Sequence, residues 1–247
     1  MPAPGGSIAV YRAGLDGVLL ADRGARGRLF FSGRQVSDLF HRISTNDIRA
    51  LAPGQGTPSL LLTGKGRILD RLLILAVEGG LLVFTSAGTG EETSERIRKY
   101  IVFEEVSTAD HTPETFLWEL SGPLSVRLLE ESAGAPGPED GWLSLPLGHH
   151  RVILMGGRKV RVIRDMDLEA PSFLLCGRAG DWEGVAQVLK EKGTPLGLVF
   201  GADVPGGETA LEALRIRAGR PAPDHELSEE WTPLEMRAED ALSCTKG

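Results

Sequence analysis

The spacing of apolar residues in the N-terminal part of the chain predicts one helix among several short strands. Between Gln35 and Ile43 the apolar residues recur at intervals of three and four, which places them on one face of a helix. Short apolar runs predict one strand within 16–31, ending in Arg28-Leu29-Phe30-Phe31, and further strands over 58–63, 67–77 and 81–85. Glycine-rich turns at 64–66 and 78–80 join the last three runs, so we expect an antiparallel meander.

The remainder of the chain alternates helical segments with strands. Thr89 or Thr93 is a candidate cap for the first of these helices and Asp181 for the third. Helices are expected over 91–100, 124–132, 182–192 and 208–218. Strands are expected over 116–120, 142–147, 151–155, 160–163 and 172–176, with a loop at 133–141. Antiparallel strands mixed with helices predict an α+β fold.

Composition and charge restrict the class of protein. The 247 residues allow one large or two small domains. A formal net charge of −7 argues against strong non-specific binding to nucleic acid. The sequence has no apolar run of 18 residues, no signal-peptide pattern and only two cysteines, so we expect a cytoplasmic protein that does not enter a membrane. The His149-His150 pair lacks a third ligand at a metal-site spacing, so no metal is expected.

The motifs of common nucleotide-binding, metalloprotease and hydrolase sites are absent from the sequence. Two polar segments are candidate sites instead. Residues 44–47 follow the first predicted helix, where they either cap it or point into a cleft. Asp70 stands on an apolar strand between basic residues, and the segment is either a site, since a buried carboxylate needs a partner, or a solvated surface hairpin.

Two further segments near the C-terminus carry charge. Arg215 and Arg217 end the last predicted helix before Gly219 and Pro221. Their guanidinium groups either bind a carboxylate or phosphate or simply cover the outside of that helix. Glu235 lies just after a proline, in Pro233-Leu234-Glu235.

In this order, the segments resemble the folate-binding family that contains the glycine-cleavage T-protein (aminomethyltransferase) and the YgfZ-like proteins of tRNA modification and iron–sulfur chemistry. Thr45-Asn46-Asp47 matches the family's T-N-D, and residues 65–69 match K-G-R-I-L. The other matches are L-x-x-G at 51–54, K-Y-I at 99–101, V-x-x-x-D at 106–110, G-P at 122–123, L-R-I-x-A-G-x-P at 214–221 and P-L-E at 233–235. Lys246-Gly247 matches the start of the YgfZ-like signature K-G-C-Y-x-G-Q-E.

The resemblance implies an aminomethyltransferase-like folate-binding fold, with mixed and antiparallel sheets and flanking helices around a tetrahydrofolate pocket. The implied domains are a first folate-binding α/β subdomain at 1–120, interleaved with 195–247, and a ferredoxin-like α/β subdomain at 121–194. Family members usually end in a barrel that this sequence does not contain. We therefore expect the chain to be C-terminally incomplete.

The resemblance also implies a set of site residues. Asp70 or Glu235 would face the N–H groups of the pterin ring, and Arg215, Arg217 or Lys246 would bind the carboxylates of the glutamate tail. If the protein is an aminomethyltransferase, Asp70 is the expected catalytic carboxylate, which positions the folate amine. The expected folate-binding residues are Asn46, Asp47, Lys65, Arg67, Asp70, Arg215, Arg217, Glu235 and Lys246.

Two departures from the aminomethyltransferase pattern favour the YgfZ-like branch. Asp70-Arg71 replaces a pair of acids, and Arg217 replaces the glutamate of L-R-x-E-A-G. The first hypothesis is therefore a folate-binding protein of iron–sulfur cluster maintenance or tRNA modification, with iron–sulfur enzymes as partners. The alternative is an aminomethyltransferase that moves a one-carbon unit from an aminomethyl-carrier protein to tetrahydrofolate. A third hypothesis is a scaffold with an empty pocket.

Overall fold

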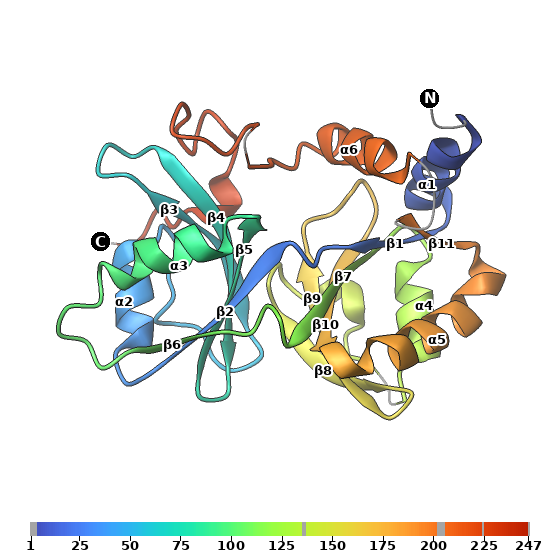
Figure 1. Cartoon of the computed structure of the whole chain (residues 1–247), viewed down its shortest axis with the longest axis horizontal. Helices are drawn as coiled ribbons and strands as arrows, with labels where there is room; N and C mark the ends of the chain where they lie inside the picture. The colour runs from blue at the N-terminus through green and yellow to red at the C-terminus, as the bar shows by residue number, and fades with distance from the viewer. Residues whose placement is uncertain (1–3, 135–136, 202–205, 224, 247) are drawn as a thin grey trace. The chain divides into compact units, whose positions relative to one another are not determined.

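A computed structural model describes residues 4–134, 137–201, 206–223 and 225–246 of the chain, which divides into two compact units (Figure 1). Unit 1 comprises Met1–Arg23, Glu114–Pro146 and His150–Arg220. Unit 2 comprises Gly24–Pro113, Leu147–His149 and Pro221–Gly247. The subdomain boundaries expected from the sequence, 1–120 with 195–247 and 121–194, stay a prediction, because compactness alone does not define a family subdomain.

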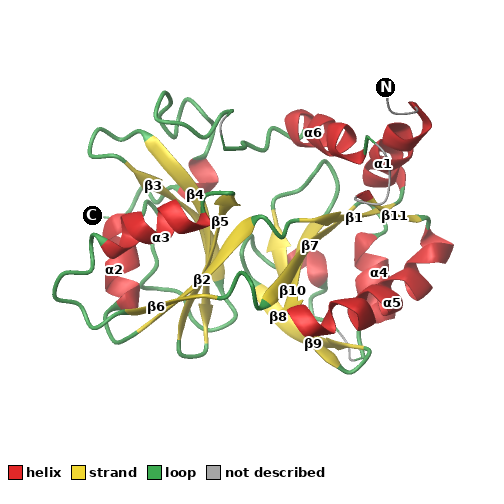
Figure 2. Ribbon diagram, viewed as in Figure 1, coloured by secondary structure: helices red, strands yellow, loops and turns green. Residues whose placement is uncertain are grey.

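Unit 1 is built on a six-stranded sheet of order β11-β1-β7-β10-β9-β8 (Figure 2). Its strands are β1 (Val18–Asp22), β7 (Thr115–Ser121), β8 (His150–Met155), β9 (Arg158–Asp165), β10 (Ser172–Arg178) and β11 (Leu198–Phe200). The β1–β11 pair is parallel, and the other pairs are antiparallel. Its helices are α1 (Pro4–Asp16), α4 (Ser125–Ser132), α5 (Trp182–Gly193) and α6 (Gly207–Arg217).

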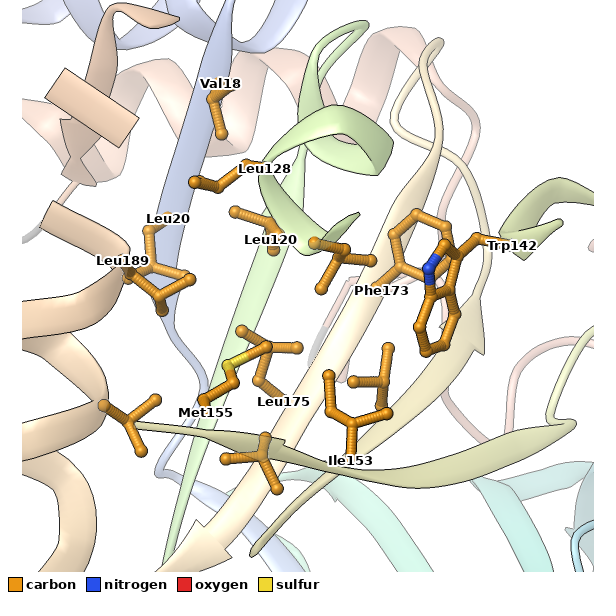
Figure 3. Close-up of a cluster of buried hydrophobic side chains, with 14 of the residues drawn as sticks. Val18, Leu20, Leu120, Leu128, Trp142, Ile153, Met155, Phe173, Leu175 and Leu189 are labelled. Carbon is orange, nitrogen blue, oxygen red and sulfur yellow. The ribbon is translucent and has the colours of Figure 1, made fainter. Parts of the chain in front are cut away.

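Helices α4 and α5 cover one face of this sheet and bury its main core (Figure 3). Leu128 from α4 and Leu189 from α5 meet strand residues such as Leu120 and Leu175, while Trp142 stands edge-on to the ring of Phe173. A second cluster joins α1 to α6 and β1 through Val10, Ala13, Leu19, Ala210 and Leu214. Burial of these aliphatic and aromatic groups is the main source of stability for unit 1.

Unit 2 is an antiparallel five-stranded sheet of order β3-β4-β5-β2-β6. Its strands are β2 (Arg26–Ser32), β3 (Gly56–Leu62), β4 (Ile68–Val77), β5 (Gly80–Ala87) and β6 (Ser107–Asp110). Helices α2 (Val36–Ile43) and α3 (Gly90–Arg98) pack on one face, where Phe40 and Ile97 join Leu72 and Ile74 of β4 in a single core. A smaller cluster holds the C-terminal segment, whose Leu227 and Ala238 pack against Leu60 and Ile68.

The α+β class and the β3–β4–β5 meander are confirmed, and both sheets are open in the described part of the chain. The predicted strand at 142–147 is wrong, because Trp142–Ser144 form a short 3-10 helix that buries the Trp142 ring. Thr89 and Asp181 occupy the N-cap positions of α3 and α5, as predicted, although neither side chain makes a capping hydrogen bond. Thr93 lies inside α3 and caps nothing.

The sequence pattern missed α1, β1, β6 and β11. Helix α1 contains three glycines in PGGSIAVYRAGLD, each of which disfavours a helix by about 1 kcal/mol. Its contacts with α6 and β1 outweigh that cost. Of the predicted loop at 133–141, residues 135–136 lie outside the described residues. No helix in the described ranges has both the length and the apolar character that a membrane span requires.

Candidate functional site

The polar segment 44–47 connects α2 to β3 and to the C-terminal segment of unit 2. The Phe40 carbonyl accepts from the Ser44 amide at 3.1 Å and from the Ser44 hydroxyl at 2.7 Å, so Ser44 closes the last turn of α2. The Thr45 hydroxyl donates to the Ala241 carbonyl at 2.6 Å and accepts from the Leu60 amide at 2.8 Å. This part of the segment therefore holds secondary-structure elements together.

The side chain of Asn46, in the same segment, makes several hydrogen bonds. Its amide group donates to the Thr57 hydroxyl at 2.8 Å and to the Pro58 carbonyl at 3.0 Å, both on β3. Its side-chain oxygen accepts from the Asp47 amide at 2.9 Å. Both ends of the carboxamide are thus engaged by the protein, which fixes the loop conformation.

Asp47 and Lys246 lie close together at the edge of this loop. Asp47 Oδ1 is 3.0 Å from His41 Nδ1, and the carboxylate is half-exposed. Lys246 Nζ donates to the Ser44 carbonyl oxygen. Partial burial lowers the pKa of Lys246, Arg49 lowers it further, and the Asp47 carboxylate opposes both effects. The structure therefore brings three of the predicted site residues (Asn46, Asp47 and Lys246) together, whereas Gly247 lies outside the described residues.

A second group gathers where the β3–β4 turn meets the C-terminal segment. Arg67 Nη1 donates to the Glu230 carbonyl at 2.7 Å and lies 3.5 Å from Glu235 Oε2. The same Glu235 oxygen accepts from the amide and hydroxyl of Thr232 at 2.8 and 2.7 Å, and these bonds lower the pKa of Glu235. Lys65 is exposed on the turn, and its side chain makes no ion pair with any residue that the structure describes.

Asp70 is buried, with 2% of its surface exposed, so the solvated-hairpin interpretation is wrong for this residue. Its Oδ1 accepts from the Ser86 amide at 3.2 Å. Its Oδ2 accepts from the hydroxyls of Thr89 at 2.8 Å and Thr93 at 2.6 Å. The carboxylate therefore ties β4 to β5 and to α3. The next residue, Arg71, points to the opposite face of the sheet and forms an ion pair with Asp240.

Arg215 and Arg217 lie at the end of α6 in unit 1. Arg215 makes a bidentate pair with Glu212 at 2.8 and 2.6 Å. Arg217 lies 2.6 Å from Glu169 and donates to the Tyr11 hydroxyl at 3.0 Å, and these bonds raise the pKa of Arg217. Arg215 Nη1 also donates to the Arg220 carbonyl, so all three guanidinium nitrogens bond to the protein, which favours the interpretation of Arg215 as a structural helix residue. The folate roles of all nine candidates stay predictions.

Sequence reasoning missed a buried charge network in unit 1. Glu119, 1% exposed on β7, lies 2.7 Å from Arg23 Nε and accepts from the Ser172 hydroxyl at 2.7 Å. Arg220 pairs with Glu119 through one guanidinium nitrogen and with Asp165, at 2.6 Å, through another. Burial by itself would raise the pKa of Glu119, but Arg220 and Arg23 lower it well below its usual range.

A signal for this network was present in the sequence. Glu119 interrupts the apolar strand 116–120, which is the same argument that singled out Asp70. Among the described residues, no group of three or more histidine, cysteine or acidic side chains could hold a metal ion.

Known proteins resemble this chain over most of its length. Residues 9–246 match the model of the GCVT N-terminal domain. A chloroplastic protein of Arabidopsis thaliana, named as a transferase, is 28% identical over 94% of this chain and 51% of its own length. An aminomethyltransferase of Chlorobium phaeovibrioides is 25% identical over 98% of this chain and 64% of its own length. The chain thus spans about half to two thirds of these relatives.

Solved structures agree on the fold. The aminomethyltransferase T of the glycine cleavage system from Bartonella henselae superposes with a TM-score of 0.78 at 17% identity, over 98% of this chain and 65% of that one. A chain of the heterotetrameric sarcosine oxidase from Corynebacterium sp. U-96 gives a TM-score of 0.57 at 13% identity, over 78% of this chain and 93% of that one. These likenesses show a shared fold.

Proposed function

Because the chain belongs to the GCVT N-terminal domain family, we propose that it is the tetrahydrofolate-binding part of an aminomethyltransferase. The observation that carries the proposal is the extent of the family match, which runs over residues 9–246 and includes all nine candidate residues. Aminomethyltransferases are also among the relatives that align with nearly the whole chain. The reaction moves a one-carbon unit from an aminomethyl-carrier protein to tetrahydrofolate.

The donor set of unit 2 contains both kinds of group that a folate needs. The glutamate tail carries two carboxylates, and Lys65 and Lys246 supply cations within one unit. Arg67 lies 3.5 Å from Glu235 and is therefore grouped with that carboxylate and not with the tail. Glu235 uses one carboxylate oxygen for its protein contacts, so the other can accept from N–H groups of the pterin ring.

Asp70 has a different role in this proposal. Its two oxygens accept three hydrogen bonds from the protein, and only 2% of the residue's surface is exposed, so a ligand has little access to the carboxylate. We therefore assign Asp70 as a positioning residue that holds α3 on the sheet.

Bound tetrahydrofolate supplies the nitrogen that receives the one-carbon unit. The protein contributes to catalysis mainly by holding that nitrogen against the donor carbon, since positioning alone can supply several kcal/mol, roughly 7–11 in the best cases. In the candidate set, Lys246 orients the tail, and Glu235 with its neighbour Arg67 orients the ring.

One observation favours a second candidate function. At the two positions where the resemblance expects further acids, Arg71 pairs with Asp240, and Arg217 pairs with Glu169 and Tyr11. An arginine carries no carboxylate of its own, and the neighbouring acids, Asp240 and Glu169, are engaged in ion pairs with these arginines. The second candidate is therefore a YgfZ-like folate-binding protein of iron–sulfur cluster maintenance or tRNA modification, which binds folate without transferring the aminomethyl unit.

Two measurements test these functions. Calorimetric titration with tetrahydrofolate tests binding, and Glu235→Gln should weaken it at least tenfold while the exposed control Glu229→Gln leaves it unchanged. Formation of methylenetetrahydrofolate from an aminomethylated lipoyl carrier tests transfer. Binding with turnover supports the aminomethyltransferase, and binding without turnover supports the second candidate. Absence of binding at millimolar tetrahydrofolate refutes both and leaves the scaffold hypothesis.

A further inference from the structure

A small pocket opens in unit 2 between the C-terminal ends of α2 and α3 and the adjoining ends of β3 and β4. Its volume is about 160 Å³. Aliphatic side chains from α2 and the two strands form most of the lining, and Arg96, Lys99 and Tyr100 come from the end of α3 and just beyond it. The complete lining is Ile43, Leu61, Leu62, Leu69, Arg96, Lys99 and Tyr100. None of the nine folate candidates lines this pocket.

The size of the pocket restricts its occupant. Pockets for cofactors and drug-sized ligands usually have volumes of about 300–1,000 Å³. A volume of about 160 Å³ is too small for a folate, yet it accepts one bulky apolar side chain. Protein interfaces commonly concentrate binding energy in such a pocket, filled by a single aromatic or aliphatic anchor.

A loop with exposed apolar side chains continues from the pocket. Tyr100, which lines the pocket, is 50% exposed, and beyond it Val102 and Phe103 are 68% and 94% exposed. The Glu104 carboxylate fixes the loop by accepting from the Val102 amide at 2.9 Å and the Phe103 amide at 3.1 Å, and it also pairs with Arg42. These bonds lower the pKa of Glu104 to about 2. The loop therefore holds two apolar side chains in solvent.

The charges on α3 indicate whether a partner would be acidic or basic. Glu91 and Glu92 lie in the first turn of the helix and Arg96 and Arg98 in its last turn, next to the pocket, with the exposed Glu95 between the two groups. Arg96 is paired with Glu92. Arg98 and Lys99 are exposed and make no ion pair with any part of the chain that the structure describes. Carboxylates on a partner would complement these two cations and accelerate its docking.

We propose that the pocket and the loop 100–103 bind an acidic segment of a partner protein, which inserts one bulky apolar side chain into the pocket. The carboxylates of that segment pair with Arg98 and Lys99, while Val102 and Phe103 cover its apolar flank. This docking surface is separate from the folate candidates and does not depend on the proposed function.

The test uses a short acetylated peptide with one central phenylalanine between glutamates, titrated into the ¹⁵N-labelled chain and followed by NMR. We expect saturable shifts confined to the pocket lining and to residues 98–104. A peptide with alanine at the centre should bind at least fivefold more weakly. A peptide with lysines in place of the glutamates should not bind.

Protein variants separate the two contributions. Arg98→Glu combined with Lys99→Glu should weaken peptide binding at least tenfold, and Phe103→Ser at least threefold. Leu143→Ser, which removes an exposed apolar side chain from unit 1, is the matched control and should change nothing. Tetrahydrofolate affinity should be unchanged in all these variants, so failure of this proposal is distinguishable from failure of the folate proposal.

Several results would overturn the proposal. One is the absence of shifts at millimolar peptide, and another is equal binding of the alanine-centred peptide. Sedimentation with phosphatidylcholine–phosphatidylserine vesicles that is lost in Phe103→Ser would assign the loop to a membrane surface instead. A concentration-dependent dimer that is lost in the same variant would assign it to a second copy of the chain.

Discussion

Arg220→Met tests the buried charge network of unit 1. The substitution keeps most of the side-chain length but removes two ion pairs, one with Glu119 and one with Asp165. Glu119 remains buried and retains Arg23 and Ser172, while Asp165 loses its ion pair with Arg220. Breaking a buried pair by removing one partner costs about 3–5 kcal/mol, and the retained contacts of Glu119 favour a value of about 3 kcal/mol.

Urea unfolding at neutral pH, followed by tryptophan fluorescence, measures this cost. With a slope of about 2 kcal/mol per molar urea, a loss of about 3 kcal/mol lowers the unfolding midpoint by about 1.5 M. Arg127→Met is the matched control, because Arg127 pairs with Glu131 on the exposed face of α4, where such pairs contribute at most about 1 kcal/mol.

A double variant distinguishes the network from simple loss of packing. When Glu119→Gln is combined with Arg220→Met, the buried negative charge disappears together with its cation. The loss of stability in the double variant should be at least about 1 kcal/mol smaller than the sum of the two single losses. Additive losses, or a cost below about 1 kcal/mol for Arg220→Met alone, would refute the assignment of a buried, energetically coupled network.

Three further predictions address pH, Asp70 and a turn glycine. Since the folded-state pKa of Glu119 is lowered, its contribution to stability is complete above about pH 4.5 and is lost as the pH falls toward the folded-state pKa. Urea midpoints measured across that range should decline less steeply in Glu119→Gln than in the unmodified chain. Asp70→Ala should destabilise the chain by about 2–3 kcal/mol, because it leaves buried donors on Ser86 and Thr93 without an acceptor. Asp70→Asn should cost less, since its side-chain oxygen can still accept a hydrogen bond. Equal urea midpoints for these two variants would contradict the positioning role. Gly33→Ala should lower the thermal midpoint, since φ is +125° and the new Cβ would lie 1.9 Å from the Glu105 carbonyl oxygen. The control is Gly64→Ala, whose new Cβ would have no atom within 4 Å and should leave the thermal midpoint unchanged.

The elements that the sequence predicted correctly are those whose pattern is local. Helix α2 shows a clear helical spacing, and the β3–β4–β5 meander has apolar runs separated by glycine turns. Helix α1 and strand β11 depend on partners far away in sequence, α6 for the former and β1 for the latter. No local pattern reports such partners, so sequence reasoning could not find these two elements.

The side-chain contacts of the candidate site were likewise not predictable from the local sequence. Alternation along the strand places Asp70 and Arg71 on opposite faces, but only the fold reveals that α3 covers the Asp70 face. Its partners Ser86, Thr89 and Thr93 come from a strand, a turn and a helix. Hydrogen bonds of this kind depend on tertiary geometry, which residue type and spacing do not encode.

The charge network also has a consequence for folding during synthesis. The residues of the helix-covered core of unit 2 lie between Leu29 and Val106, so all of them leave the ribosome well before Arg220. Unit 1 cannot complete its network until Arg220, its last residue, emerges and reaches Glu119. We therefore expect this core of unit 2 to form first on the nascent chain, with unit 1 closing afterwards around a contact of very long sequence separation.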